Sequence, residues 1–167
     1  MAKGLRIIEG GRSGLDVRQA VTDLLDDCEL LCLATSTGTA GPHVATLYFA
    51  HEAFAVWFVS SRDTEHGRQV QMNPRVAAAV FVPCAYGEGL RGLQLAGTVR
   101  RARPAEAADG LGVYETRFPA FAVPSAERDQ LLAGQAQQTL FRFEVDAVTL
   151  VDEPRFGPGR HRALVVR

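Results

Sequence analysis

Six side chains that can bind an anion follow the apolar residues 54–59: Ser60, Ser61, Arg62, Thr64, His66 and Arg68. Hydroxyl groups donate hydrogen bonds to phosphate oxygens, and a guanidinium group or a protonated imidazole adds charge-assisted bonds of about 1.5–3 kcal/mol each. A short helix that opens after such a run adds free backbone amides. The residue types and their spacing therefore predict a phosphate site, with a polar loop that caps a helix as the alternative.

Two acidic residues lie inside the same run. Asp63 and Glu65 would repel a phosphate group if their carboxylates pointed toward it. Because side chains alternate between the two sides of an extended segment, the hydroxyl groups can face one side and the carboxylates the other. We expect this arrangement if the segment binds phosphate.

The composition limits the kinds of partner. The 167 residues fit a single domain, 1–167, with a core of its own. The 18 basic and 19 acidic residues give a net charge of −1, so the overall charge favours neither nucleic acid nor a membrane as a partner. Lysine occurs once, at Lys3. Arginine and histidine must therefore supply the cations of any local anion site.

The cysteine and hydropathy patterns favour a reducing compartment. Cys28 and Cys32 have a C-x-x-x-C spacing inside an apolar run, which matches zinc sites poorly, and Cys84 stands apart, so we expect no metal. The sequence has no signal-peptide pattern and no apolar stretch of about 18 residues. We therefore expect a cytoplasmic protein.

Three helices are predicted outside the polar run. Apolar residues recur at helical spacing over about 14–28, where Ser13 or Asp16 can serve as the cap. The segments 104–116 and 125–137 are rich in Ala, Glu, Leu and Gln, and a proline opens the first of them. These helices are expected to cover a sheet.

Segments dense in Val, Leu, Phe, Thr and Tyr predict strands at about 29–36, 43–51, 54–60, 75–83, 91–103 and 139–151. The turn residues 37–42 and the short connection 51–53 predict an antiparallel meander of the first three strands. One or two helical turns are expected within 63–74. Six or seven antiparallel strands with few helices predict a mainly β fold, a barrel whose closure removes exposed edges. Residues 1–13 are expected to form a loose N-terminal arm and residues 152–167 a C-terminal arm.

The polar run and its surroundings resemble the FMN-binding signature of the pyridoxamine-phosphate-oxidase-like split barrels. The shared features are a strand that ends in hydroxyl groups, a polar loop with a cation, a brief helix, and Asn73-Pro74 before the next strand. The resemblance covers about residues 29–103 and continues more weakly to residue 167. It implies an antiparallel split β-barrel of six to seven strands that binds FMN, with FAD, a deazaflavin or haem as alternatives.

The matched positions imply phosphate ligands. Ser60 matches the hydroxyl residue at the strand end, Thr64 the serine of the family's Ser-Arg-Lys triplet, and His66 its lysine. Glu65 stands where the family has arginine, so one phosphate cation is missing. Arg62 or Arg68 is expected to replace it, and Ser61 adds a hydroxyl group to the same loop.

The resemblance also implies contacts with the flavin ring. Residues 43–49 correspond to the strand under the ring, where backbone groups of Ala45, Thr46 and Leu47 are expected to meet it. Gln94 lies in a segment similar to a family strand with an inward glutamine, and is either a flavin contact or a sheet-face residue. The strand lacks the oxidase's lysine and arginine, so a true pyridoxamine phosphate oxidase is not expected.

Members of this superfamily form homodimers, so the resemblance implies a homodimer with the cofactor at the subunit interface. Arg160 or His161 either completes the partner's site or belongs to a flexible basic tail. His43 and His51 are expected to be solvent-facing turn residues. Three functions stay open: a flavin-dependent oxidoreductase with a small-molecule substrate, a non-catalytic flavin-binding module, and a haem-binding or haem-degrading barrel.

Overall fold

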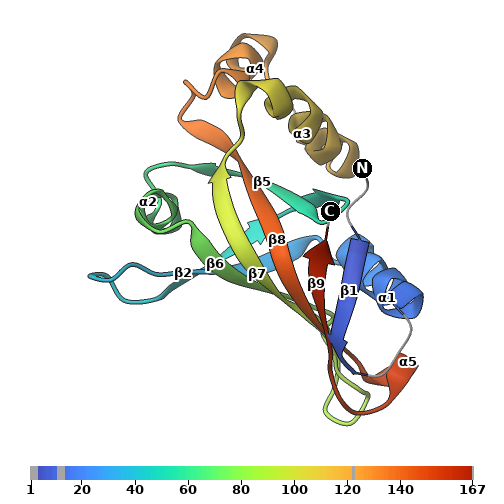
Figure 1. The fold of residues 1–167 in the computed structure, drawn as a ribbon. Helices are drawn as coiled ribbons and strands as arrows, with labels where there is room; N and C mark the ends of the chain where they lie inside the picture. Colours follow the sequence, from blue (N-terminus) through green and yellow to red (C-terminus); the bar gives the residue numbers. More distant parts are fainter. Residues whose placement is uncertain (1–3, 11–13, 122, 167) are drawn as a thin grey trace.

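The computed structural model describes residues 4–10, 14–121 and 123–166. The strands in these ranges form one nine-stranded antiparallel sheet (Figure 1): β1 (Gly4–Glu9), β2 (Leu30–Thr35), β3 (His43–Tyr48), β4 (Ala50–Glu52), β5 (Ala55–Ser61), β6 (Arg75–Phe81), β7 (Arg91–Arg101), β8 (Gln138–Asp152) and β9 (His161–Val166). The helices are α1 (Gly14–Asp27), α2 (Glu65–Met72), α3 (Pro104–Arg117), α4 (Ser125–Leu132) and α5 (Glu153–Phe156).

The longest strand, β8, organises the sheet. It pairs along its length with β7, while its other edge pairs first with β5 and then with β9. A bulge opposite Ala96 and Gly97 leaves Asp146 without a partner in β7, between these two halves. Glycine is required there because a Cβ on Gly97 would collide with the carbonyl oxygen of Glu144. The bulge thus lies where the partner of β8 on its other edge changes from β5 to β9.

The barrel is open on one side. Residues 43–52 bend at Phe49, so that β3 pairs with β2 whereas β4 pairs with β5. Beyond the bend, β3 and β5 are not paired with each other in the described sheet. Helix α2 follows β5 directly and packs against β2 and β3 (Figure 1). Helix α2 therefore lies at one end of the opening between β3 and β5.

The turn between β4 and β5 has an unusual sequence. Ala53 and Phe54 form the two-residue connection, and both have positive φ angles, 46° and 66°. Such a mirror-image turn suits the twist of a hairpin, although it usually contains Gly or Asn. The Phe54 ring is buried in the core, and its burial offsets a backbone cost of about 1–2 kcal/mol per residue.

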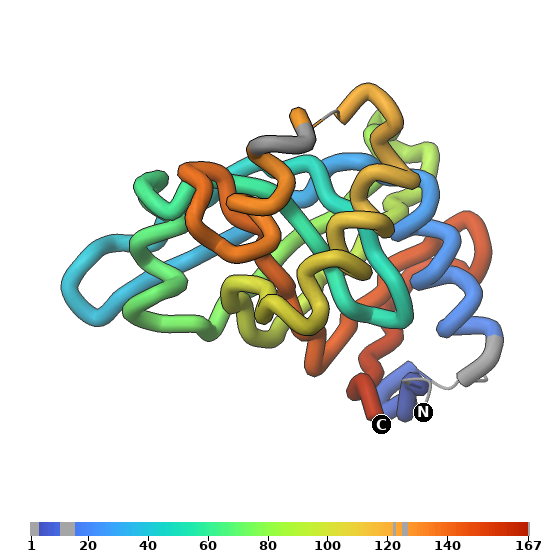
Figure 2. Tube along the Cα trace, turned by 90° about the horizontal axis from the view of Figure 1, so that it is seen from above, coloured from blue at the N-terminus to red at the C-terminus, as the bar shows by residue number. Residues whose placement is uncertain are grey.

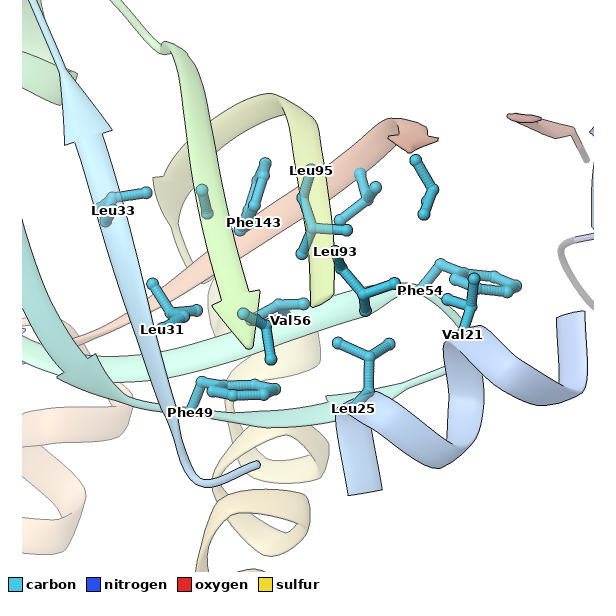
Figure 3. Packing of buried hydrophobic residues seen from close by; sticks show 14 of the residues in the cluster. Val21, Leu25, Leu31, Leu33, Phe49, Phe54, Val56, Leu93, Leu95 and Phe143 are labelled. Atoms are coloured by element: carbon cyan, nitrogen blue, oxygen red, sulfur yellow. The ribbon is translucent and has the colours of Figure 1, made fainter. Parts of the chain in front are cut away.

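Helix α1 closes one end of the barrel core. Figure 3 shows Val21 and Leu25 of α1 pointing into the barrel, toward Phe54, Phe49 and Val56. A second, smaller cluster lies on the other side of β5 and β8, where α3 and α4 pack (Figure 2). The two clusters pack on opposite faces of β5, the strand whose end carries Ser60.

Most predicted elements are confirmed. The helix at 14–28 is α1, the two later helices are α3 and a shorter α4, and each of the six predicted strands is present. The expected cap residue Ser13 lies outside the described residues. The meander is confirmed as antiparallel pairing, but its middle strand divides into β3 and β4.

Two predictions about the chain ends are wrong. The arm at 1–13 contains β1, and the arm at 152–167 contains α5 and β9, which pairs with β1. The predicted fold class is confirmed as a mainly β, antiparallel split barrel, although the described sheet has nine strands rather than six or seven and is not closed. The two ends form strands because β9 pairs with β8 and then supplies the backbone partner of β1. Among the described helices, none is long and apolar enough to cross a membrane.

Candidate anion-binding site

A polar layer ends the barrel core beneath α2. Its five buried side chains come from four elements: Thr35, Ser60, His66, Gln69 and Thr139. Ser60 on β5 and Thr139 on β8 are directly paired, so their side chains share the core face. Thr35 Oγ1 donates to Gln69 Oε1 over 2.8 Å. The predicted hydroxyl run therefore enters the barrel interior and is not only a surface loop.

Three of the predicted ligands meet at one imidazole. His66 Nε2 lies 2.8 Å from Ser60 Oγ and 3.1 Å from Thr64 Oγ1. His66 is 6% exposed and Ser60 is 8% exposed. Burial lowers the pKa of His66 from its ordinary value, and the charge of His43 lowers it further. The ring is therefore neutral at pH 7.

The hydrogen bonds around Thr64 indicate where the imidazole proton lies. Thr64 Oγ1 donates its proton to the carbonyl oxygen of Ser61 and accepts from the Gly67 amide, as the cap of α2. Toward His66, Thr64 can only accept, so a hydrogen bond there requires a proton on Nε2. That N–H also reaches Ser60 Oγ. The Ser60 hydroxyl then keeps its own proton free for a ligand oxygen.

The helix start packs closely on the loop before it. A Cβ on Gly67 would lie 2.5 Å from the carbonyl oxygen of Ser61 and 2.8 Å from that of Arg62. Gly67 thus lets the first turn of α2 lie against the loop. The amides of Glu65 and His66 have no acceptor among the described residues, as expected at a helix start.

The acidic residues point to other partners. Glu65 accepts from Arg68 over 2.6 Å and from Gln69 over 2.9 Å. These hydrogen bonds, with Arg68 first, lower the pKa of Glu65. Asp63 is exposed on the loop. Glu65 is thus engaged by α2 side chains, and Asp63 lies on the exposed side of the loop.

The two candidate replacement cations differ. The Arg68 guanidinium donates to Glu65 and to the carbonyl oxygen of Asp63, so it is held away from the buried ring. Arg62 is half-buried and makes no hydrogen bond or ion pair with the described residues. Arg62 is therefore the cation that remains available to an anion, together with the Ser60 proton and two helix amides. This set fits a phosphate group.

The predicted ring contacts lie on an unpaired edge. β3 pairs only with β2 in the described sheet, so alternate backbone groups of Ala45, Thr46 and Leu47 are free on its other edge. Gln94 is exposed on the outer sheet face, in register with Ala79 and thus in the same row as Thr46. Three strand spacings separate them, about 14 Å. The structure does not bring Gln94 to β3 within one chain.

The remaining histidines have fixed surroundings. His51 Nε2 lies 2.8 Å from Asp26 Oδ1, and its side chain is only 10% exposed. His161 is buried in β9 and packs on Phe156. Arg160 pairs with Glu9 over 3.2 Å. The expectations of a solvent-facing His51 and of a flexible tail at 160–161 are therefore wrong.

Sequence reasoning missed two residues of the site. His43 was expected at the solvent, but its half-buried ring stacks on His66 with centroids 6.2 Å apart and planes at 12°. Thr139 lies beside Ser60, and its buried hydroxyl has no partner in the described chain. No local pattern marks either residue, since both reach the site only through strand pairing and the opening beside β3.

Comparisons with known proteins identify the family and the fold. The family model described as pyridoxamine 5'-phosphate oxidase matches residues 17–152. A search of the curated proteins found no match. The solved structures include similar folds below 25% identity, which support the fold alone.

Three of these structures illustrate the likeness. A haem-binding protein from Mycobacterium smegmatis has a TM-score of 0.66 and 20% identity over 87% of this chain and 57% of its own. A putative 5-nitroimidazole antibiotic resistance protein from Bacteroides thetaiotaomicron gives 0.65 and 12% over 100% and 93%. A putative pyridoxamine 5'-phosphate oxidase from Listeria innocua gives 0.62 and 12% over 80% and 97%. This chain thus spans just over half the length of the first. By its sequence match and its open barrel, the chain belongs to the pyridoxamine 5'-phosphate oxidase family of split barrels.

Proposed function

We propose that this chain binds FMN and is a flavin-dependent oxidoreductase with a small-molecule substrate. One observation carries the proposal: Ser60, Thr64 and His66 meet at the end of an unpaired strand edge. The hydroxyls and the imidazole suit a phosphate group, and the free backbone of β3 suits the polar edge of a flavin ring. Family membership supports the same assignment.

The chain's own residues would bind and orient the cofactor. Ser60, Arg62 and the amides of Glu65 and His66 would hold the phosphate, and β3 would hold the ring. When bound, the flavin supplies the hydride and electron transfer, so the protein needs no acid or base of its own. The position of the family's substrate-phosphate lysine is not filled here, which argues against pyridoxamine phosphate as the substrate.

Haem is the second candidate, because one similar structure is named as a haem-binding protein. An axial ligand needs an accessible imidazole nitrogen. The Nε2 atoms of His66 and His51 are engaged, and His161 is buried. Only the half-buried His43 could serve without rearrangement among the histidines, and it stacks on His66. These surroundings favour flavin.

We also propose a homodimer that forms through the outer face of β2, β3 and β6. Leu30, Tyr48 and Phe81 share one row of this face by strand register, and each is about half exposed. They line a pocket of about 810 Å³ that also includes Cys32 and Thr46. An apolar patch of this kind marks an interaction surface. A second copy on this face could also bring its Gln94 toward the flavin ring at β3.

The dimer has a direct test. Light scattering at micromolar concentration should give twice the chain mass, and Phe81→Glu should give a monomer. Met72→Glu changes an even more exposed apolar side chain on α2 and should leave the mass unchanged. A monomeric wild-type protein would contradict the dimer.

The absorbance spectrum of the purified protein tests the cofactor. Bound flavin gives the two-band absorbance spectrum of a flavin, whereas haem gives a Soret band. Loss of NAD(P)H with oxygen present then separates an oxidoreductase from a carrier. Apoprotein that does not bind added FMN would overturn the proposal, and a Soret band on addition of haem would favour the second candidate.

A further inference from the structure

We propose that His43 and His66 act as one stacked imidazole pair that takes up a proton when a phosphate group binds, so that phosphate affinity rises as the pH falls. The inference rests on the proposed FMN site and assigns to His43 a binding role beyond it. Its basis is the parallel stack of a strand residue on a helix residue across the opening of the barrel.

The stack makes the two rings electrostatically dependent. With centroids 6.2 Å apart, a proton on one ring disfavours a proton on the other. His66 already has a lowered pKa, through burial first and His43 second. When no anion is bound, the two rings are therefore not both protonated.

Other charges near the pair do not supply a counterion. On α2, Glu65 is held by Arg68 and Gln69, although it also feels the charge of His43. In the loop, Asp63 is exposed and Arg62 adds positive charge. The neighbouring side chains from β2 and β8, Thr35 and Thr139, are neutral. A bound phosphate would therefore be the main negative charge that faces the rings.

The proton balance follows from the hydrogen bonds. The neutral His66 ring already carries its proton on Nε2, where it serves Ser60 and Thr64. The added proton comes from solvent and goes to the bare Nδ1 of His66 or to His43. One proton is expected for the pair, because two would place like charges in a stack. The negative charge of a phosphate dianion stabilises this added proton by electrostatic attraction.

The pH dependence of binding tests the inference. FMN affinity should rise as the pH falls from 8.5 to 6.5, by up to about tenfold per pH unit for one linked proton. Riboflavin, which has no phosphate group, should show no such slope. This range stays above the second ionisation of a phosphate monoester, with a pKa of about 6. His43→Gln should flatten the FMN slope.

Proton counting provides a second readout. Titration calorimetry in buffers with different ionisation enthalpies should show net uptake of up to one proton with FMN and none with riboflavin. The four histidines give four sets of imidazole NMR signals, and FMN should raise the pKa of His43 or His66 but not those of His51 and His161. The last two serve as internal controls.

The outcomes separate the two proposals. If FMN binds with the same pH dependence as riboflavin and without proton uptake, the imidazole pair is wrong while the flavin site stands. If FMN does not bind at any pH, the proposed function is wrong, and the inference fails with it. If His43→Gln keeps the full FMN slope, His66 acts alone and the paired role of His43 is overturned.

Discussion

Two polar clusters of this molecule differ in how completely their charges and donors are satisfied. Under α3, Arg100 and Arg142 pair with Glu106 and Glu144, and Arg103 also lies 3.6 Å from Glu106, so each charge has a partner of opposite sign. Beneath α2, the cluster around His66 is neutral, and Arg62 and the Ser60 proton have no acceptor in the described chain. A cluster of paired charges fixes structure, whereas one with an unpaired cation and a spare donor can bind an anion.

The pKa values express the same difference. Hydrogen bonds from Arg100 first, and then from Arg142 and the Arg103 amide, hold the pKa of Glu106 far below its usual range. At His66 the pKa is lowered because burial disfavours the cation and no carboxylate supports it. The charged groups of the first cluster are already paired with opposite charges inside the protein. The imidazole of the second cluster has no such partner.

The largest expected effect is on ligand binding beneath α2. Thr64→Ala combined with His66→Ala removes the helix cap and the imidazole, which position the phosphate donors, and should weaken FMN binding by about a hundredfold, at about 1.5 kcal/mol for each lost contribution. Fluorescence titration of the apoprotein measures this. Circular dichroism should still show the fold, since the lost cap costs about 1 kcal/mol. Unchanged affinity would remove Thr64 and His66 from the site.

The next effect is on stability under α3. Glu106→Gln leaves Arg100 and Arg142 without their shared carboxylate and should lower the free energy of unfolding by about 2 kcal/mol. This is less than for a fully buried pair, because Arg100 is 32% exposed. Urea unfolding measures the loss, and FMN affinity should not change.

A matched surface pair controls for the loss of any ion pair. Arg75 and Asp146 are both more than half exposed, so Arg75→Ala should change stability by less than about 0.5 kcal/mol. If Arg75→Ala and Glu106→Gln had equal effects, the cluster under α3 would not be a special feature of the fold.

A smaller effect separates the two arginines near the helix start. Arg62→Ala should weaken FMN binding about tenfold, since it removes one charged donor. Arg68→Ala should change affinity less than about twofold, because that guanidinium is held by Glu65. The reverse order would mean that Glu65 and Arg68 separate when the ligand binds.

The smallest effect is a pH dependence of stability without ligand. His66 and His51 have lowered pKa values in the folded protein, His51 mainly through burial. Below about pH 6.5 the unfolded chain binds the extra protons, so stability should fall from pH 7 to pH 5.5. His66→Gln should reduce this loss by up to about 1 kcal/mol, measured by thermal unfolding at each pH. A steeper loss in the variant would contradict the lowered pKa.

The sequence predicted the elements whose signals are local. The strand at 54–60, its hydroxyl end and the brief helix after it all follow from side-chain types within a few residues, and α2 begins where Thr64 caps it. The antiparallel pairing also follows from short connections. The predicted contacts with a cofactor stay predictions.

What the sequence did not predict depends on distant partners. β1 lacks a clear period, and it forms because β9 pairs with it. The turn at Ala53–Phe54 carries no Gly or Asn, and is held by burial of the Phe54 ring. His43 gave no local signal because its stacking partner lies on α2, across the opening of the barrel. Tertiary contacts decide each of these cases.

The pairing of β1 with β9 has a consequence for synthesis of the chain. About 150 residues separate the two strands, and a ribosome adds about 5–20 residues per second, so β1 waits roughly 8–30 s for its neighbour. During that time Leu5 and Ile7, which later pack on the core, have no strand to cover them. The last edge of the sheet is therefore completed only when translation has reached β9. Until then the nascent protein depends on whatever shields an unpaired strand in the cell.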